Sequence, residues 1–184
     1  MRRALISIAA PCIALSAVLL GASREAHAGL AIAADAHAGV ALSAPYEKQF
    51  GLGVSGRLGF RIDLINFDVG PLFVTPEVGG GYWTFGDAGH PGRAFAGARV
   101  GLGSRFQPSI FAHAGYGLVR SVGNYNFDGF TADGGAALEF QIVPTLGVGV
   151  HGGYFTNRYS DATAAGIQKS INWVDFGLQV TVNL

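Results

Sequence analysis

Residues 175–184 read DFGLQVTVNL, and this stretch decides the fold class. Its even-numbered positions hold Phe, Leu and Val, while its odd-numbered positions hold Asp, Gly, Gln, Thr and Asn. Successive side chains of a β-strand point to opposite faces of a sheet, so a two-residue period places the apolar side chains on one face. A helix would lose this parity within one turn. The stretch therefore predicts a strand with one apolar face.

The same parity extends over nearly the whole chain. From position 34 onward, 25 of the Leu, Ile and Val residues are even-numbered and six are odd-numbered. We expect nearly all of the six exceptions to lie in turns or loops; they are Ile65, Val69, Val119, Val143, Ile167 and Ile171. Charged residues show the opposite preference for odd positions, so the second face of the predicted sheet is polar.

Turn signals divide the chain into eight segments. We expect strands near residues 33–43, 49–64, 72–85, 93–103, 108–120, 129–142, 146–156 and 172–184. The connections after the second, fourth and sixth strands are short, as is APYEK after the first. Those after the third, fifth and seventh are longer and more polar: GDAGHPG, SVGNYNFD and residues 157–170. This alternation indicates an antiparallel up-and-down barrel whose two ends differ.

Glycine indicates which face points inward. Most of the glycines in the predicted strands occupy odd positions, on the polar face. Small side chains relieve crowding on the concave side of a closed sheet, so the polar face is the inner one. The even face then meets lipid, and its aromatic residues gather near the strand ends as two girdles. They are Tyr82, Tyr116, Phe130 and Tyr154 near the long connections, and Phe60 and Phe140 near the short turns.

The N-terminus has the features of a secretory signal peptide. Arg2 and Arg3 precede an apolar run from Ala4 to Leu20, and Ala26-His27-Ala28 has the small-x-small pattern of a cleavage site. We expect residues 1–28 to be removed and residues 29–184 to form the barrel domain. A second AHAG at 36–39 is a weaker cleavage site, because cutting there would leave too little of the first strand. The net charge of zero, with 13% charged residues, argues against nucleic-acid binding.

The signal peptide, the eight alternating segments and the terminal amphipathic strand together resemble the small outer-membrane barrels of the OmpA/OmpX type. The resemblance is one of pattern over residues 29–184, and Leu184 stands where members usually end in Phe or Trp. It implies a monomeric, integral protein of the bacterial outer membrane, in contact with its lipid and inserted by the barrel-assembly machinery. It also implies that the long connections are extracellular.

The inward polar residues must satisfy one another inside the barrel. Pairing across INFDVGP places Glu77 between Arg57 and Arg61, and pairing across GDAGHPG brings Arg99 diagonal to Glu77. We therefore expect a network of ion pairs in the lumen, formed by Arg57, Arg61, Glu77, Arg99, Asp133, Glu139, His113, His151 and Asp175. The alternative is a narrow gated pore in which these links exchange partners.

A second inward cluster is aromatic and lies near the long connections. It consists of Trp83, Phe85, Phe95, Phe155 and Trp173. Aromatic side chains inside closed barrels mostly fill space, so a lid over the outer mouth is one interpretation. The other is a pocket for a small apolar ligand.

Enzyme chemistry finds little support in the sequence. Ser109 and His113 both face inward, but four residues along one strand separate them by about 13 Å, too far for a hydrogen bond. Neither His113 nor His151 has a second ligand two residues along its strand, and we expect neither a metal nor a cofactor. We therefore expect a non-catalytic barrel with a structural or surface-interaction role; the alternative is a narrow channel or conduit for small apolar solutes.

Overall fold

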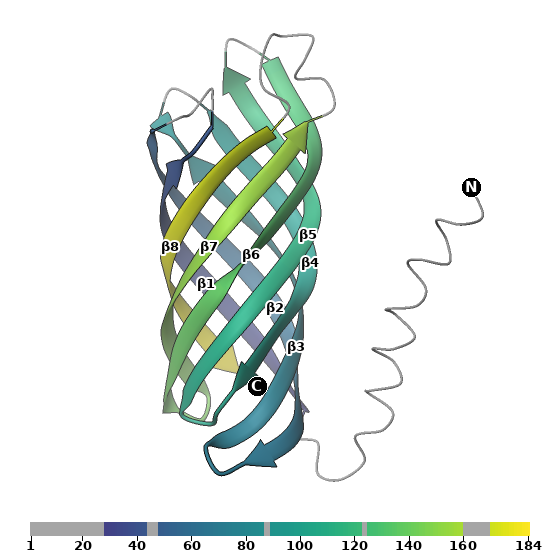
Figure 1. Ribbon diagram of the computed structural model, residues 1–184, viewed down its shortest axis with the longest axis vertical. Coiled ribbons are helices and arrows are strands. Elements are labelled where there is room, and N and C mark those ends of the chain that lie inside the picture. Colours follow the sequence, from purple (N-terminus) through teal and green to yellow (C-terminus); the bar gives the residue numbers. More distant parts are fainter. Residues whose placement is uncertain (1–27, 44–47, 87–88, 123–124, 160–169) are drawn as a thin grey trace, which may run out of the picture.

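The computed structural model describes residues 28–43, 48–86, 89–122, 125–159 and 170–184. Eight strands form one closed all-antiparallel barrel, tilted around a common axis (Figure 1). The strands are β1 Ala28–Ala41, β2 Phe50–Phe67, β3 Gly70–Thr84, β4 His90–Leu102, β5 Phe106–Val122, β6 Tyr125–Val143, β7 Leu146–Tyr159 and β8 Ser170–Asn183. No helix in the described ranges is long and apolar enough to cross a membrane.

Each strand pairs with its neighbours in the chain, and β1 pairs with β8 to close the ring. At this closing seam Ala31 lies opposite Asn183 and Ala41 opposite Trp173. Closure leaves no unpaired edge around the ring, which is the condition for placing a sheet in hydrocarbon. The predicted eight-stranded up-and-down barrel is confirmed.

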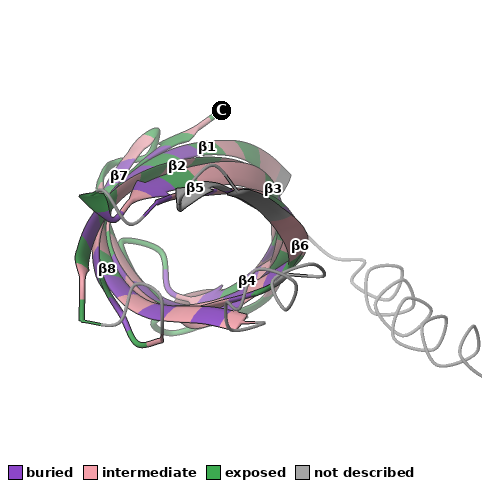
Figure 2. Cartoon of the chain, turned by 90° about the horizontal axis from the view of Figure 1, so that it is seen from above, coloured by how far each residue is buried: buried purple, intermediate pink, exposed green. Residues whose placement is uncertain are grey.

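The two faces of the wall differ as the parity predicts. Buried and exposed residues alternate along the strands (Figure 2). Large apolar side chains are exposed on the outside, among them Phe176 at 72% and Leu178 at 67%. The six predicted girdle aromatics are also exposed: Phe60, Tyr82, Tyr116, Phe130, Phe140 and Tyr154. An apolar exterior of this extent fits a lipid environment rather than water.

Of the six odd-numbered exceptions, Val69 lies in a turn as predicted and Ile167 lies outside the described residues. The other four fall into two groups. A register shift between Asp63 and Ile65 and another between Gln141 and Val143 each reverse the parity, so Ile65 and Val143 become exposed. Both lie within strands and not in turns, which corrects the prediction. Val119 and Ile171 also lie within strands, and they are buried at 1% and 2% exposure.

Several predicted connections are also corrected. SVGNYNFD is mostly strand, because β5 extends to Val122 and β6 begins at Tyr125. APYEK belongs to a longer gap between β1 and β2 than expected, and β1 begins at Ala28, earlier than position 33. The predicted signal peptide lies outside the described residues except for Ala28.

The β5–β6 hairpin extends beyond its neighbours. Pairing of β4 with β5 ends at the Arg120–His90 pair, and pairing of β6 with β7 begins at the Gly129–Tyr159 pair. Residues 125–127 of β6 therefore pair only with β5 in the described sheet.

Glycines on the inner face let large rings lie directly on the wall. A Cβ atom added to Gly53 would lie 2.4 Å from Trp83 Cδ1. One added to Gly51 would lie 2.5 Å from the Phe85 ring. Gly51 and Gly53 thus leave the space on the inner wall that the Phe85 and Trp83 rings occupy.

Candidate functional site

The enclosed lumen holds the polar and aromatic residues that could carry a function. From the long-connection end to the turn end it contains an aromatic lid, a histidine layer and an ionic network. The aromatic lid is Trp83, Phe85, Phe95, Phe155 and Trp173; the histidine layer is His37, His151 and Asp175; the ionic network is Asp35, Arg57, Glu77, Arg93, Arg99, His113 and Asp133.

Glu77 on β3 is the centre of the ionic network. Its Oε1 accepts a hydrogen bond from Arg99 Nε at 3.0 Å and lies 3.3 Å from Arg57 Nε. Its Oε2 lies 2.9 Å from Nε2 of His113. All of these groups are at most 9% exposed, so Glu77 balances buried positive charge from three neighbouring strands.

The network continues to both sides of Glu77. His113 Nδ1 lies 2.9 Å from Asp133 Oδ2, and Asp133 also accepts a hydrogen bond from Arg93. Arg57 Nη1 donates to both oxygens of Asp35 at 2.6 Å. Because both ring nitrogens of His113 face carboxylates, both must donate, and the ring is then an imidazolium.

The two remaining predicted network residues lie nearer the turn end. Glu139 accepts hydrogen bonds from Gln141, Gln179 and Thr181, at 2.5, 2.6 and 2.8 Å. Strand pairing sets Glu77 opposite Gly59, between Arg57 and Arg61 as expected, but the Arg61 side chain has other partners. Its Nε donates to Asp63, two residues along the same face, at 2.7 Å, and its Nη1 donates to Gln107 at 2.8 Å. The nearer carboxylate on its own strand takes the guanidinium.

The aromatic lid is closely packed. Trp173 stacks on Phe155 with ring centroids 5.2 Å apart and planes 8° apart, and it meets the edges of Trp83 and Phe85 at 5.7 and 6.0 Å. Both tryptophans are fully buried. Arg93 joins the lid to the ionic network, because its Cζ lies 4.4 Å above Phe95 and 4.5 Å above Phe155 while its Nη1 binds Asp133.

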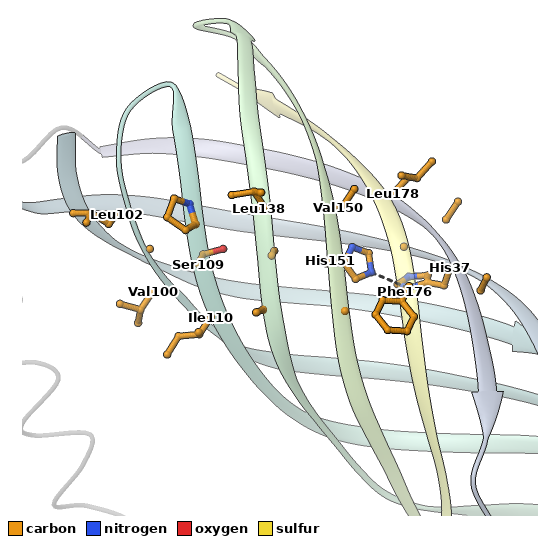
Figure 3. Close-up of a pocket in the computed structure, with 18 of the residues that line it drawn as sticks. His37, Val100, Leu102, Ser109, Ile110, Leu138, Val150, His151, Phe176 and Leu178 are labelled. Carbon is orange, nitrogen blue, oxygen red and sulfur yellow. Dashed lines mark hydrogen bonds between the residues drawn. The ribbon is translucent and has the colours of Figure 1, made fainter. Parts of the chain in front are cut away.

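The histidine layer lies between the lid and the network. His37 on β1 and His151 on β7 point toward one another, with His151 Nε2 3.0 Å from His37 Nδ1 (Figure 3). His37 Nδ1 also lies 3.1 Å from Asp175 Oδ2 on β8. The expectation that the histidines lack metal-binding geometry was based on spacing within one strand. That spacing leaves out contacts between strands, and here three different strands bring one donor atom each to within 4.8 Å of the others.

The other nitrogen of His37 meets a hydroxyl. Its Nε2 lies 2.8 Å from Ser55 Oγ, which donates to Asp35 Oδ2 at 3.0 Å. Ser55, His37 and Asp175 are therefore in line, as in a catalytic relay. The Ser109 and His113 side chains have other partners: Ser109 accepts a hydrogen bond from Arg99 at 3.1 Å.

Little open space remains in the middle of the lumen. A cavity of about 40 Å³ lies below the ionic network, lined by Arg57, Glu77, Arg99, Gln107, Ser109 and Glu139 among others. A wider recess of about 700 Å³ lies at the turn end, beside Arg61, Asp63 and Gln141. A hollow of about 1150 Å³ is lined mainly by lipid-facing side chains such as Val100, Ile110, Leu138, Val150 and Leu178 (Figure 3). It therefore belongs to the outer wall.

Several contributors were not among the predicted site residues, among them Asp35, His37, Arg93 and Gln179. All are odd-numbered, so the parity already placed them inside. Asp35 and His37 were overlooked because alanines on the even positions of β1 make its alternation weak. Arg93 stood at the edge of its predicted strand, next to the mouth.

Comparisons with known proteins show what fold this is. No protein-family model and no curated protein matches the chain. Neisserial surface protein A aligns with a TM-score of 0.63 at 11% identity, over 85% of this chain and 98% of that one. The N-terminal barrel of Pseudomonas aeruginosa OprF (14% identity, 84% and 97% covered) and the attachment invasion locus protein Ail of Yersinia pestis (13%, 88% and 100%) each align with a TM-score of 0.49. The chain has the fold of the small eight-stranded outer-membrane barrels.

Proposed function

We propose that the protein is a non-catalytic barrel of the bacterial outer membrane with a closed lumen, acting as a structural element or through its external connections. The observation that carries this proposal is the filled lumen. The cavity below the ionic network, about 40 Å³, holds roughly one water molecule. Above it, Glu77 and its partners link β2, β3, β4 and β5 across the interior.

The contacts within the network support a fixed plug more than a gate. Each guanidinium of the centre has at least two partners: Arg57 contacts Asp35, Gln179 and Glu77, and Arg99 contacts Glu77 and Ser109. Opening a path would leave buried charges without partners, which is strongly unfavourable in a narrow interior. Exchange of partners therefore has a high barrier.

The Ser55–His37–Asp175 alignment does not make the lumen a good hydrolytic site. The Ser55 hydroxyl already donates to Asp35, so its proton is not directed to His37. Ser55 also pairs with Asp35 on β1 and Gly81 on β3, so the local backbone amides serve the sheet and offer no oxyanion hole. A substrate would also have to pass the aromatic lid.

The packing of the lid bears on the alternative of an apolar conduit. Trp83, Phe155 and Trp173 are in mutual ring contact and at most 2% exposed, which supports space filling over an open pocket. If Trp83→Ala and Trp173→Ala variants lose uptake of apolar probes that the wild type takes up into vesicles, the conduit is the better description.

Planar-bilayer recording tests the closed lumen. We expect the wild type to be silent, while a triple variant Arg57→Ala/Glu77→Ala/Arg99→Ala, which removes the centre of the plug, conducts. The conducting variant shows that silent wild-type protein had inserted. Stable single-channel steps from the wild type would overturn the proposal.

Orientation is tested separately on intact cells. We expect an epitope inserted between residues 160 and 169, which join β7 to β8, to bind antibody without permeabilisation. The same epitope in the turn at 144–145, between β6 and β7, serves as the control and should bind only after lysis. The reverse pattern would place the long connections on the inner side.

A further inference from the structure

We propose that His37, His151 and Asp175 bind a divalent transition-metal ion of the zinc type inside the barrel. Two imidazoles and one carboxylate are a ligand set that Zn²⁺ uses in proteins. The three donors come from β1, β7 and β8, and each residue is at most 7% exposed.

The separations of the donor atoms suit one small ion. His37 Nδ1 lies 3.0 Å from His151 Nε2 and 3.1 Å from Asp175 Oδ2. Donor atoms bound tetrahedrally to one Zn²⁺ at ordinary bond lengths stand about 3.3 Å apart. The remaining pair of donors lies within 4.8 Å, a separation that a small side-chain rotation closes.

Asp175 provides an independent observation. Its side chain is fully buried, and among the described residues neither carboxylate oxygen has a hydrogen-bond partner. A buried carboxylate without donors is strongly unfavourable, so a positive charge is expected beside it. The described ion pairs give Asp175 no arginine; its one close neighbour is His37.

Ser55 determines what His37 presents to Asp175. The Ser55 hydroxyl has a single proton and gives it to Asp35, so it must accept from His37 Nε2. In a neutral ring, Nδ1 then carries a lone pair aimed at His151 and Asp175. A lone pair facing a carboxylate is repulsive unless a cation lies between them. Ser55 thus holds His37 in the tautomer that binds a metal, as outer-shell partners do in known sites.

The charges of the lumen also leave room for a cation. Over the whole lumen, the described residues include four inward arginines, Arg57, Arg61, Arg93 and Arg99, and the His113 imidazolium. They face six inward carboxylates: Asp35, Asp63, Glu77, Asp133, Glu139 and Asp175. One negative charge is in excess, and Asp175 is the carboxylate without any hydrogen bond. A bound divalent ion would reverse this imbalance.

The position of the ligands connects the ion to barrel closure. β1 and β8 pair only when the ring closes, with Gly39 opposite Asp175 and His37 opposite Gly177. The unclosed chain therefore does not assemble the three donors, and the ion would bind the closed barrel selectively. By mass action it would then stabilise the folded state.

Zinc titration of the full-length protein, refolded in detergent micelles and stripped with a chelator, tests the site. We expect one Zn²⁺ per chain with micromolar or tighter affinity. Asp175→Asn and His151→Gln should weaken binding at least 100-fold, and Ser55→Ala, an outer-shell change, by about 10-fold. His113→Gln removes a histidine of equal burial outside the site and should leave zinc affinity unchanged.

A second measurement needs no variant. The Trp83 ring lies 5.2 Å from the His37 ring, so Co²⁺ in place of zinc should quench tryptophan fluorescence and show visible d–d absorption. If the variants do not fold, a stoichiometric Co²⁺ signal from the wild type still supports the site. Absence of any metal uptake by the wild type, with His37 simply protonated against Asp175, would overturn it. Equal uptake by Asp175→Asn would do the same.

Discussion

Replacing Glu77 by Gln removes one negative charge from the centre of the ionic network while keeping the side-chain volume. The Glu77 side chain is 4% exposed and is in contact with Arg57, Arg99 and His113. Breaking a buried pair by neutralising one partner destabilises a protein by about 3–5 kcal/mol, because the other charge stays buried. Arg57 keeps Asp35 and His113 keeps Asp133, so Arg99 bears most of the loss.

The measurement is urea unfolding in phospholipid vesicles, followed by the fluorescence of the buried Trp83 and Trp173. Asp63→Asn is the matched control, since Asp63 pairs with Arg61 at 21% exposure and should lose at most about 1 kcal/mol. The double variant Glu77→Gln/Arg99→Met removes both partners and should recover part of the loss. If Glu77→Gln is no less stable than Asp63→Asn, the reasoning about buried charge is wrong.

Three further predictions test other parts of the fold. Gly53→Val should destabilise the barrel by about 2 kcal/mol or more through overpacking, because the new Cβ atom would lie 2.4 Å from Trp83. In the same urea assay, the control Gly56→Ala should be neutral, because the nearest atom to its new Cβ is 3.8 Å away. On the outer face, Leu178→Arg should destabilise the barrel by about 2–4 kcal/mol in vesicles. The control Val69→Arg, at similar exposure but in a turn, should change the free energy of unfolding little. Equal effects of the two substitutions would argue against a lipid-facing belt. Terminal sequencing of the exported protein should begin at Gly29, and a start at Gly39 would contradict the predicted cleavage site.

Most of the fold follows from parity, because a closed sheet repeats one rule in every strand. Residues Asp175–Leu184 alternate without exception between polar or small odd-numbered residues and apolar even-numbered residues. This alternation determines which side chains face outward and which face inward. Parity fails where the pairing itself changes. The register shifts near Asp63 and Gln141 insert one residue, so Ile65 and Val143 turn outward. The alternation of apolar and polar residues does not reveal either shift in advance.

The site was harder to predict than the wall. Parity identifies which side chains enter the lumen, but the stagger of the closed ring decides which of them meet. His37 and His151 are separated by 114 positions in sequence and become neighbours only through closure at β8. Arg61 lies beside Glu77 in the register, as predicted, but its guanidinium binds Asp63 on its own strand, a choice that parity does not determine.

The hairpin of β5 and β6 beyond the ring has a consequence for solvent exchange of the backbone. Within the ring every strand has two partners, so successive amides are held alternately from either side. Residues 125–127 have β5 as their one partner strand in the described sheet, and every second amide there points away from it. In deuterated buffer we expect every second backbone amide of this ribbon to exchange its hydrogen rapidly, while the amides of residues 131–140 exchange slowly. The boundary between rapid and slow exchange then marks where the closed barrel wall ends.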